Sequence, residues 1–388
     1  MHIQTIETIA EEIRAVYRHL HAHPELSGEE AETARFLKSE LEALGPEVKD
    51  YGQHALSIDI VGEGGPGRLV AIRADTDALP ILEETGLSYR SKNEGVMHAC
   101  GHDVHMAVLL GTARYFMHHR NFPGTLRLLF QPDEEKNGGA EPMVKKGAMD
   151  GVDYVIGLHV SHQLPLGVYG VLPGFMNASV DDFVIEIRGK GGHAAHPQEC
   201  KDPIVAGAHV ICALQTIVSR KLSPLDPAVV TVGSAHGGTK PNIIPDTFTL
   251  TGTLRAHTAI NRGYLQKKLA EIAETTARAF DCEAKVEILE GYIPLFNDPD
   301  TTEKVRRALA DAFGEERVRA LPSASMGAED FAYFAEAARG TFFNIGVAPK
   351  EGPVYPTHSS RFAPQESALF DGIAGEVAAA LYLLQESE

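Results

Sequence analysis

The sequence predicts an α/β protein with a mostly parallel sheet and a smaller α+β domain inserted into it. Short apolar, β-branched segments alternate with helical segments over residues 55–160, and the same alternation returns after about residue 292. Between them, the order strand, helix, strand, strand, helix, strand is typical of a ferredoxin-like α+β sandwich. We therefore expect a discontinuous domain of residues 1–180 and 292–388 and an inserted domain of residues 181–291.

The larger domain is expected to open with two helices. Apolar residues recur at helical spacing until Pro24, and residues 27–45 predict a second helix that begins at a Ser27 cap and ends at Gly45. The remaining segments follow from β-branched runs or from helical spacing. The strands are expected at 55–61, 68–74, 125–131, 154–160 and 340–347, and the helices at 104–120, 302–314 and 366–385.

The inserted domain has a strand and a helix in its first half, then two strands, a helix and a last strand. We expect these elements at 183–189, 202–220, 228–237, 246–256, 260–280 and 284–290.

Composition excludes several classes of function. Of the 388 residues, 44% are hydrophobic and 23% are charged, as in folded soluble proteins, and no apolar run approaches the ~20 residues of a membrane span. An excess of 53 Asp and Glu over 35 Lys and Arg argues against nucleic acid as a partner. The N-terminus lacks the features of a secretory signal, and the four cysteines form no compact framework. A cytoplasmic location is therefore expected, with no membrane partner.

Polar side chains stand directly after several predicted strands. In open α/β sheets, ligands bind beyond the carboxyl ends of the strands, so these side chains are expected to meet at one edge. A crowd of carboxylates is costly unless a cation compensates it, and thiol and imidazole donors favour zinc, cobalt or manganese over calcium or magnesium. The candidates are Asp75, Asp77, Cys100, His102, Asp133, Glu134, Glu135 and His159.

Other chemistries lack their motifs. The segment 62–67, GEGGPG, matches the spacing of a dinucleotide loop, but it contains Pro66 and leads into a strand, so we expect a tight turn. The chain contains neither H-E-x-x-H nor G-x-S-x-G. Helical zincins and serine hydrolases with a nucleophile elbow are thereby disfavoured.

Nine motifs in order resemble those of the M20 metallopeptidases. The closest resemblance is to the amidohydrolase branch, which contains aminoacylases, hippurate hydrolases, auxin-conjugate hydrolases and thermostable carboxypeptidases. The motifs span nearly the whole chain. They are RADTDALP (73–80), MHACGHDVHMA (97–107), FQPDEEKNGGA (131–140), GLHV (157–160), GKGGHAAHP (189–197), GGTKPNIIPD (237–246), GTLRA (252–256), MGAEDFAYF (326–334) and THSSRF (357–362).

The resemblance implies two divalent metal ions, zinc, manganese or cobalt, and a role for each matching residue. Glu134 would be the general base, and Asp77 would orient a metal ligand. Asn242 and Arg255 would bind the carboxylate of the substrate, and His193 would reach the active site of a partner subunit in a homodimer or larger homo-oligomer. The implied metal ligands are Cys100, His102, Glu135, His159 and His358.

These roles predict an enzyme that cleaves the amide of N-acyl amino acids with metal-activated water, releasing a carboxylic acid and a free amino acid. A metallo-carboxypeptidase acting on short peptides is the enzymatic alternative, and a catalytically silent dimeric binding protein is the alternative from another class. We expect Asp103 to support a ligand from behind. His98, His105, Glu329 and Asp330 receive no role from the sequence.

Overall fold

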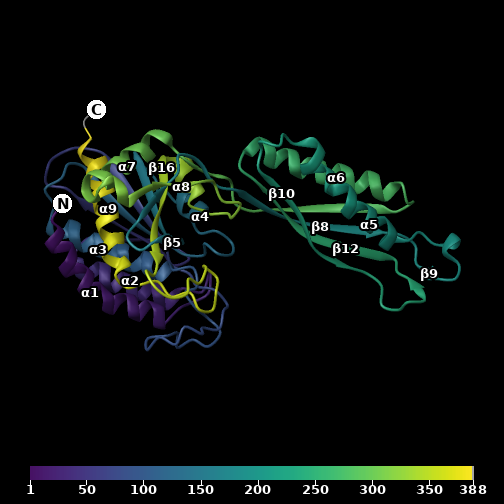
Figure 1. The fold of residues 1–388 in the computed structure, drawn as a ribbon, viewed down its shortest axis with the longest axis horizontal. Coiled ribbons are helices and arrows are strands. Elements are labelled where there is room, and N and C mark those ends of the chain that lie inside the picture. Colours follow the sequence, from purple (N-terminus) through teal and green to yellow (C-terminus); the bar gives the residue numbers. More distant parts are fainter. Residues whose placement is uncertain (387–388) are drawn as a thin grey trace. The chain divides into compact units, whose positions relative to one another are not determined.

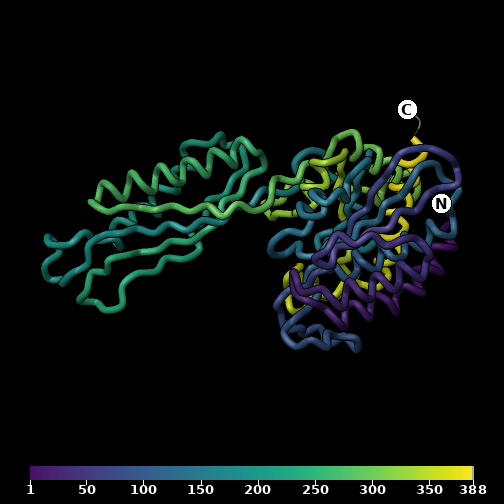
Figure 2. Tube along the Cα trace, turned by 180° about the vertical axis from the view of Figure 1, so that it is seen from behind, coloured from purple at the N-terminus to yellow at the C-terminus, as the bar shows by residue number. Residues whose placement is uncertain are grey.

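The computed structural model describes residues 1–386 and divides them into two compact units (Figure 1). Unit 1 comprises residues 1–174, 296–323 and 330–386, and unit 2 comprises residues 175–295 and 324–329. Figure 2 shows the purple N-terminal and yellow C-terminal segments together in unit 1. Unit 1 is therefore built from segments that lie far apart in the sequence.

An eight-stranded sheet forms the centre of unit 1, in the order β1-β2-β4-β3-β5-β16-β6-β15. The four neighbours β4, β3, β5 and β16 pair in parallel, whereas β1–β2, β2–β4 and β16–β6 are antiparallel. The predicted α/β class with a mostly parallel sheet is confirmed. The strands are β1 (Val48–Gly52), β2 (Ala55–Val61), β3 (Leu69–Asp75), β4 (Thr125–Gln131), β5 (Tyr154–Pro165), β6 (Tyr169–Val171), β15 (Val318–Ala320) and β16 (Arg339–Ala348).

Helices cover both faces of this sheet. Phe343 belongs to the large core that contains residues of α1, α3 and α9, whereas its neighbour Phe342 packs against Phe331, just before α8. Because successive residues of a strand point to opposite faces, α8 lies on the face away from α1, α3 and α9. The helices are α1 (Ile3–Ala22), α2 (Ala31–Leu44), α3 (His102–His118), α4 (Ala140–Lys145), α7 (Pro299–Phe313), α8 (Ala332–Ala337) and α9 (Ala368–Gln385), with the 3₁₀ turn η3 (Glu315–Arg317).

Helix α2 differs from its prediction at one end. It ends at Gly45, which is left-handed with φ 103°, as expected for a glycine after a helix, but it begins at Ala31 with Glu30 as the N-cap residue. The predicted Ser27 cap is wrong. The Ser27 hydroxyl instead donates a hydrogen bond to Asp77, 2.7 Å away, so a tertiary contact uses the group that local rules assign to the helix.

Unit 2 contains a four-stranded antiparallel sheet in the order β10-β12-β8-β13, with α5 and α6 packed on it. Its strands and helices follow the order predicted from the sequence. They are β8 (Ser179–Arg188), α5 (Pro203–Leu214), the π-helical turn η2 (Ile217–Lys221), β10 (Ala228–His236), β12 (Thr247–Ala256), α6 (Ala259–Arg278) and β13 (Glu283–Glu290).

Short elements complete the chain. A two-stranded sheet pairs β9 (Gly192–His193) with β11 (Ile243–Ile244), and a second one pairs β7 (Gly174–Asn177) with β14 (Leu295–Asn297). A 3₁₀ turn, η1, spans Pro197–Glu199.

Two helical segments meet the length and hydropathy criteria for a membrane span, although the sequence predicts no apolar run of that length. Pro203–Lys221 and Ala368–Gln385 have the length and composition of a membrane span, although these criteria also fit core helices of soluble proteins. In Ala368–Gln385, which is α9, 72% of the apolar window is buried inside the protein. The apolar character of α9 is accounted for by its packing in the core of unit 1.

A buried acid in α9 makes the stability of unit 1 depend on pH. Burial raises the pKa of Glu376 to about 8, although Thr112 of α3 donates a 2.6 Å hydrogen bond to it. In the unfolded chain this carboxyl ionises near its ordinary pKa of 4.5. The unfolded state therefore loses its proton first, and the free energy of unfolding falls as the pH rises from 4.5 to about 8.

We predict that Glu376→Gln removes this pH dependence, because the amide resembles the neutral carboxyl and its oxygen can still accept from Thr112. Thermal unfolding should occur at the same temperature as in the wild type at pH 5, and at least about 3 °C higher at pH 8.5. Glu7→Gln, at an exposed position of α1, is the control and should unfold like the wild type at both pH values. Equal melting temperatures for Glu376→Gln and wild type at pH 8.5 would contradict the prediction.

Candidate metal centre

Three adjacent strands bring polar residues to one edge of the large sheet, two of them at their carboxyl ends and β5 at His159, within the strand. Strand β3 ends at Asp75 and is followed by Asp77, β4 is followed by the segment 133–135, and β5 carries His159. Because β4, β3 and β5 are parallel neighbours, these positions lie at the same edge. The strand order therefore places these polar residues at one edge of the sheet, as the sequence predicts.

Two further segments reach this edge through unusual backbone conformations. Gly101, immediately before α3, has φ 90°, and a Cβ there would lie 2.5 Å from Cγ2 of Val160. Only glycine fits this turn without strain, and it sets Cys100 and His102 on its two sides. His358, in the loop between β16 and α9, has φ 65°, which is uncommon for a residue with a side chain.

All five predicted ligands and Glu134 lie close together. The Cys100 Sγ atom is 3.5 Å from His159 Nε2, and His358 Nε2 is 3.1 Å from Glu135 Oε1. Within each of three groups, the possible donor atoms lie within 4.8 Å of one another. The groups are Cys100, His102 and His159; Cys100, Glu135 and His358; and His102, Glu134 and Glu135.

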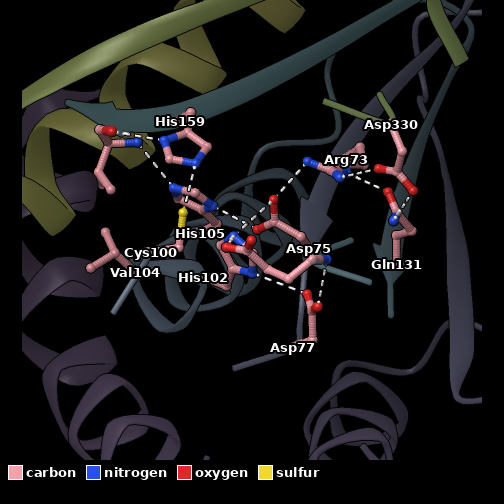
Figure 3. Close-up of polar contacts among 12 residues, drawn as sticks. Arg73, Asp75, Asp77, Cys100, His102, Val104, His105, Gln131, His159 and Asp330 are labelled. Carbon is pink, nitrogen blue, oxygen red and sulfur yellow. Dashed lines mark hydrogen bonds and ion pairs between the residues drawn. The ribbon is translucent and has the colours of Figure 1, made fainter. Parts of the chain in front are cut away.

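Hydrogen bonds behind the histidines turn their Nε2 atoms toward this cluster (Figure 3). His102 Nδ1 lies 3.1 Å from Asp77 Oδ1, and His159 Nδ1 donates to the carbonyl oxygen of Val160 at 2.7 Å. These bonds occupy Nδ1 and leave Nε2 of each ring as the atom that would bind a metal ion. Asp77 lies where the sequence prediction of an orienting carboxylate requires it.

The cluster has the properties of a cation site. His102 Nε2 is buried and has no hydrogen-bond partner within residues 1–386, and carboxylate oxygens of Asp75 and Glu135 lie 3.6 and 3.9 Å away. Burial lowers the pKa of His102, but Asp75, Asp77 and Glu135 outweigh it and raise the value to about 10. Burial and the neighbouring carboxylates raise the pKa of the Cys100 thiol well above its ordinary value. The site thus favours added positive charge, and its mixed thiol, imidazole and carboxylate donors suit a transition metal.

Sequence reasoning missed the ion pairs that support this cluster. Arg73 is almost completely buried and donates to Asp75 at 2.7 Å, to Asp330 at 2.8 Å and to Gln131 at 2.6 Å (Figure 3). Asp330 also accepts from the amide of Ala140. The position of Arg73 inside an apolar strand could have indicated these pairs, because a buried guanidinium requires acidic or amide partners.

His105 receives a structural role from its contacts. Its Nδ1 lies 2.6 Å from Asp75 Oδ1, and its Nε2 accepts the amide hydrogen of Val160 at 3.0 Å. Burial outweighs the attraction of Asp75 and lowers the pKa of His105 to about 4, so the ring is neutral. It connects β3 to β5 next to His159. Both ring nitrogens of His98 are buried without a hydrogen-bond partner in the described part of the chain.

From the sequence we expect Asp103 to support a metal ligand from behind, but its carboxylate instead pairs with His21 of α1 at 2.6 Å. Burial lowers the pKa of His21, but hydrogen bonds to Asp103 and Glu83 outweigh it and raise the value to about 10. This buried pair fixes the first turn of α3 to α1. The pair could not be predicted from the sequence, because His21 lies 82 residues from Asp103 and no local pattern connects them.

The remaining predicted residues lie in unit 2. His193 of β9 is paired with Ile243 of β11, and the amide of Ala194 donates to the carbonyl oxygen of Asn242 at 3.1 Å. His193 and Asn242 are therefore close neighbours, and both are exposed. Arg255 stands near the other end of β12, where its guanidinium contacts Thr253 and the carbonyl oxygen of Met326.

A mostly parallel sheet with a thiol, imidazoles and paired carboxylates at its carboxyl edge defines a metallohydrolase of the α/β class. The model of peptidase family M20/M25/M40 matches residues 71–381. The chain belongs to this family, and the resemblance inferred from its motifs is confirmed.

Individual relatives agree with this assignment. The chain is 41% identical over 345 residues to N-acetyl-L-cysteine deacetylase of Bacillus subtilis, covering 88% of this chain and 82% of the relative. It is 37% identical over 370 residues to thermostable carboxypeptidase 1 of Saccharolobus solfataricus, covering 94% and 93%. The crystal structure of the Bacillus subtilis YxeP protein, described as a dinuclear metal-binding peptidase of the M20 family, is 32% identical and superposes with a TM-score of 0.84 over 97% of this chain and 99% of that one. The family and these relatives support the predicted reaction class, metal-dependent hydrolysis of an amide.

We predict that His105→Leu destabilises the protein, because it leaves the amide of Val160 and one oxygen of Asp75 buried without their partner. Two such losses should lower the free energy of unfolding by about 2–4 kcal/mol, measured by urea denaturation of the metal-free protein. His118→Leu, at an exposed position at the end of α3, is the matched control. A loss for His105→Leu below about 0.5 kcal/mol, the range of ordinary surface changes, would argue against the bridging role.

Proposed function

We propose that this protein hydrolyses the amide of N-acyl amino acids with two divalent metal ions, zinc, manganese or cobalt. One observation carries the proposal: donors from separate segments converge around a buried His102 Nε2 that has no hydrogen-bond partner within residues 1–386. The residues proposed to hold the two ions are Cys100, His102, Glu135, His159 and His358.

Each residue of the site then has a defined task. Bound divalent ions lower the pKa of water and polarise an amide carbonyl. The Glu134 carboxylate, 7% exposed and beside Glu135, takes the proton of the attacking water and delivers it to the nitrogen of the leaving amine. Asp77 keeps His102 in one orientation and accepts the amide hydrogen of Glu135 at 2.9 Å, so one carboxylate orders two of the proposed ligands.

The substrate class follows from two relatives whose names differ. One name specifies an N-acetyl amino acid and the other a carboxypeptidase. Both kinds of substrate present an amide next to a free carboxylate, for which the guanidinium of Arg255 is the apt partner, with Asn242 as a second group. We favour N-acyl amino acids, with short peptides as the second candidate.

We predict that Glu134→Gln lowers kcat by at least about 10²-fold, because the amide cannot accept the proton of the attacking water. The assay compares N-acetyl and N-benzoyl amino acids with dipeptides, using the metal-loaded protein. Elemental analysis should find the same metal content in variant and wild type, and Glu94→Gln, at an exposed position, is the matched control. Chelation should abolish hydrolysis, and added metal should restore it. A wild type inactive on the whole panel, or a Glu134→Gln variant of normal activity, would refute the proposed enzyme.

The layout of unit 2 supports a substrate site completed by a second subunit. His193 and Asn242 lie beside the Thr247 end of β12, because the amide of Gly191 donates to Asp246 at 2.8 Å. Arg255 lies eight residues further along this strand, about 27 Å away at the rise of an extended strand. A small N-acyl amino acid cannot bridge that length within one unit 2. We therefore propose that His193 and Asn242 act in the site of the partner subunit of a homodimer.

We predict that hybrids of Glu134→Ala and His193→Ala subunits regain activity that neither variant has alone. In a mixed dimer, one site receives an intact Glu134 from one chain and an intact His193 from the other. Random reassortment should restore roughly a quarter of the wild-type activity, since half of the dimers are mixed and each has one complete site. Mixing the two variants without prior dissociation is the control. Hybrids as inactive as their parents would show that His193 does not act across the dimer.

A further inference from the structure

The backbone around the proposed base is held on both sides by carboxylates. The amide of Glu135 donates to Asp77, and the amide of Asp133 donates to Oε1 of Glu30 at 2.8 Å. Asp133 has φ 60°, a left-handed conformation that is uncommon for a residue with a side chain. Side-chain carboxylates therefore hold the backbone on both sides of Glu134, and one of them lies more than 100 residues away in the sequence.

Glu30 comes from a segment that is tied to this edge of the sheet at several points. The amide of Ala78 donates to the carbonyl oxygen of Glu25 at 2.8 Å, and the Ser27 hydroxyl donates to Asp77. The side chain of Glu30 is fully buried, whereas its neighbour Glu29 is exposed. Burying a carboxyl is costly, and a helix N-cap can be satisfied by an exposed Ser or Asp, so capping of α2 alone does not explain Glu30.

We propose that Glu30 is a positioning residue for the general base. This positioning role rests on the proposed function, because it gives Glu30 a part in the hydrolysis carried out by Glu134. By accepting the amide hydrogen of Asp133, Glu30 keeps the 133–135 turn in its strained conformation and the Glu134 carboxylate at the attacking water. Displacement of a catalytic group by about 1 Å can cost 10²-fold in rate, so this single hydrogen bond is sufficient to matter.

The contact does not require an ionised carboxyl. Burial raises the pKa of Glu30 to about 7, despite the backbone amides of Glu30, Gly28 and Asp133 that face it. A neutral carboxyl also offers an oxygen to the Asp133 amide, and so does the amide of glutamine. Glu30→Gln should therefore preserve the function that Glu30→Ala removes.

The test compares Glu30→Ala, Glu30→Gln and the matched control Glu29→Ala in the metal-loaded enzyme. We expect Glu30→Ala to lower kcat by about 10- to 100-fold with little change in KM. Glu30→Gln should stay within about 3-fold of the wild type, since its amide oxygen keeps the bond to Asp133. Metal content should be the same in all variants. A Glu30→Ala kcat equal to that of the wild type would overturn the proposal, as would equal losses in the Ala and Gln variants.

A second measurement does not depend on activity. Hydrogen exchange should be faster over residues 133–135 in Glu30→Ala than in the wild type, Glu30→Gln or Glu29→Ala, because only the Ala variant loses the acceptor for the Asp133 amide. Unchanged exchange in Glu30→Ala would refute the positioning role, whatever the wild type hydrolyses. A wild type that is inactive on all substrates would instead count against the proposed function.

Discussion

The structure of unit 1 is organised around buried negative charge at one edge of its sheet. Taking a carboxylate out of water costs several kcal/mol unless a cation or hydrogen-bond donors compensate it. Arg73 compensates Asp75 and Asp330, and protonated His21 compensates Asp103 and Glu83. The His21 pair connects α1 to α3, and the Arg73 pairs connect β3 beside the site to the segment before α8.

The remaining carboxylates determine the chemistry of the site, because divalent ions are the partners that would compensate their charge. Asp77, Glu134 and Glu135 lie around His102, whose raised pKa shows that this cluster attracts a positive charge. A proton on His102 meets that demand in part, and divalent ions would meet it fully while using the thiol of Cys100 and the ring of His159. The cost of burying like charges is therefore the physical basis of metal binding in the proposed function.

Much of this arrangement could be predicted from the sequence, because strand ends and motif spacing are local properties. The strands before Asp75 and Asp133, a helix close to α3, predicted at 104–120, and the α/β class all follow from apolar periodicity. The partners of buried polar groups could not be predicted. Nothing near Arg73 indicates Asp330, since 257 residues separate them, and the capping rule for Ser27 failed because Asp77 competes for its hydroxyl. Long-range electrostatic pairs decide such positions, and a single sequence does not contain their distances.

In the proposed function, the division of the chain into two units separates reaction chemistry from substrate recognition. Every proposed metal ligand and Glu134 belong to unit 1, whereas His193, Asn242 and Arg255 belong to unit 2. The ligands are constrained by buried bonds, so changes among them disturb the core as well as the site. The proposed recognition residues stand at exposed or half-buried positions of unit 2, where substitution costs little stability. In the proposed function, substitutions in unit 2 can therefore change the substrate preference without altering the hydrolytic centre of unit 1.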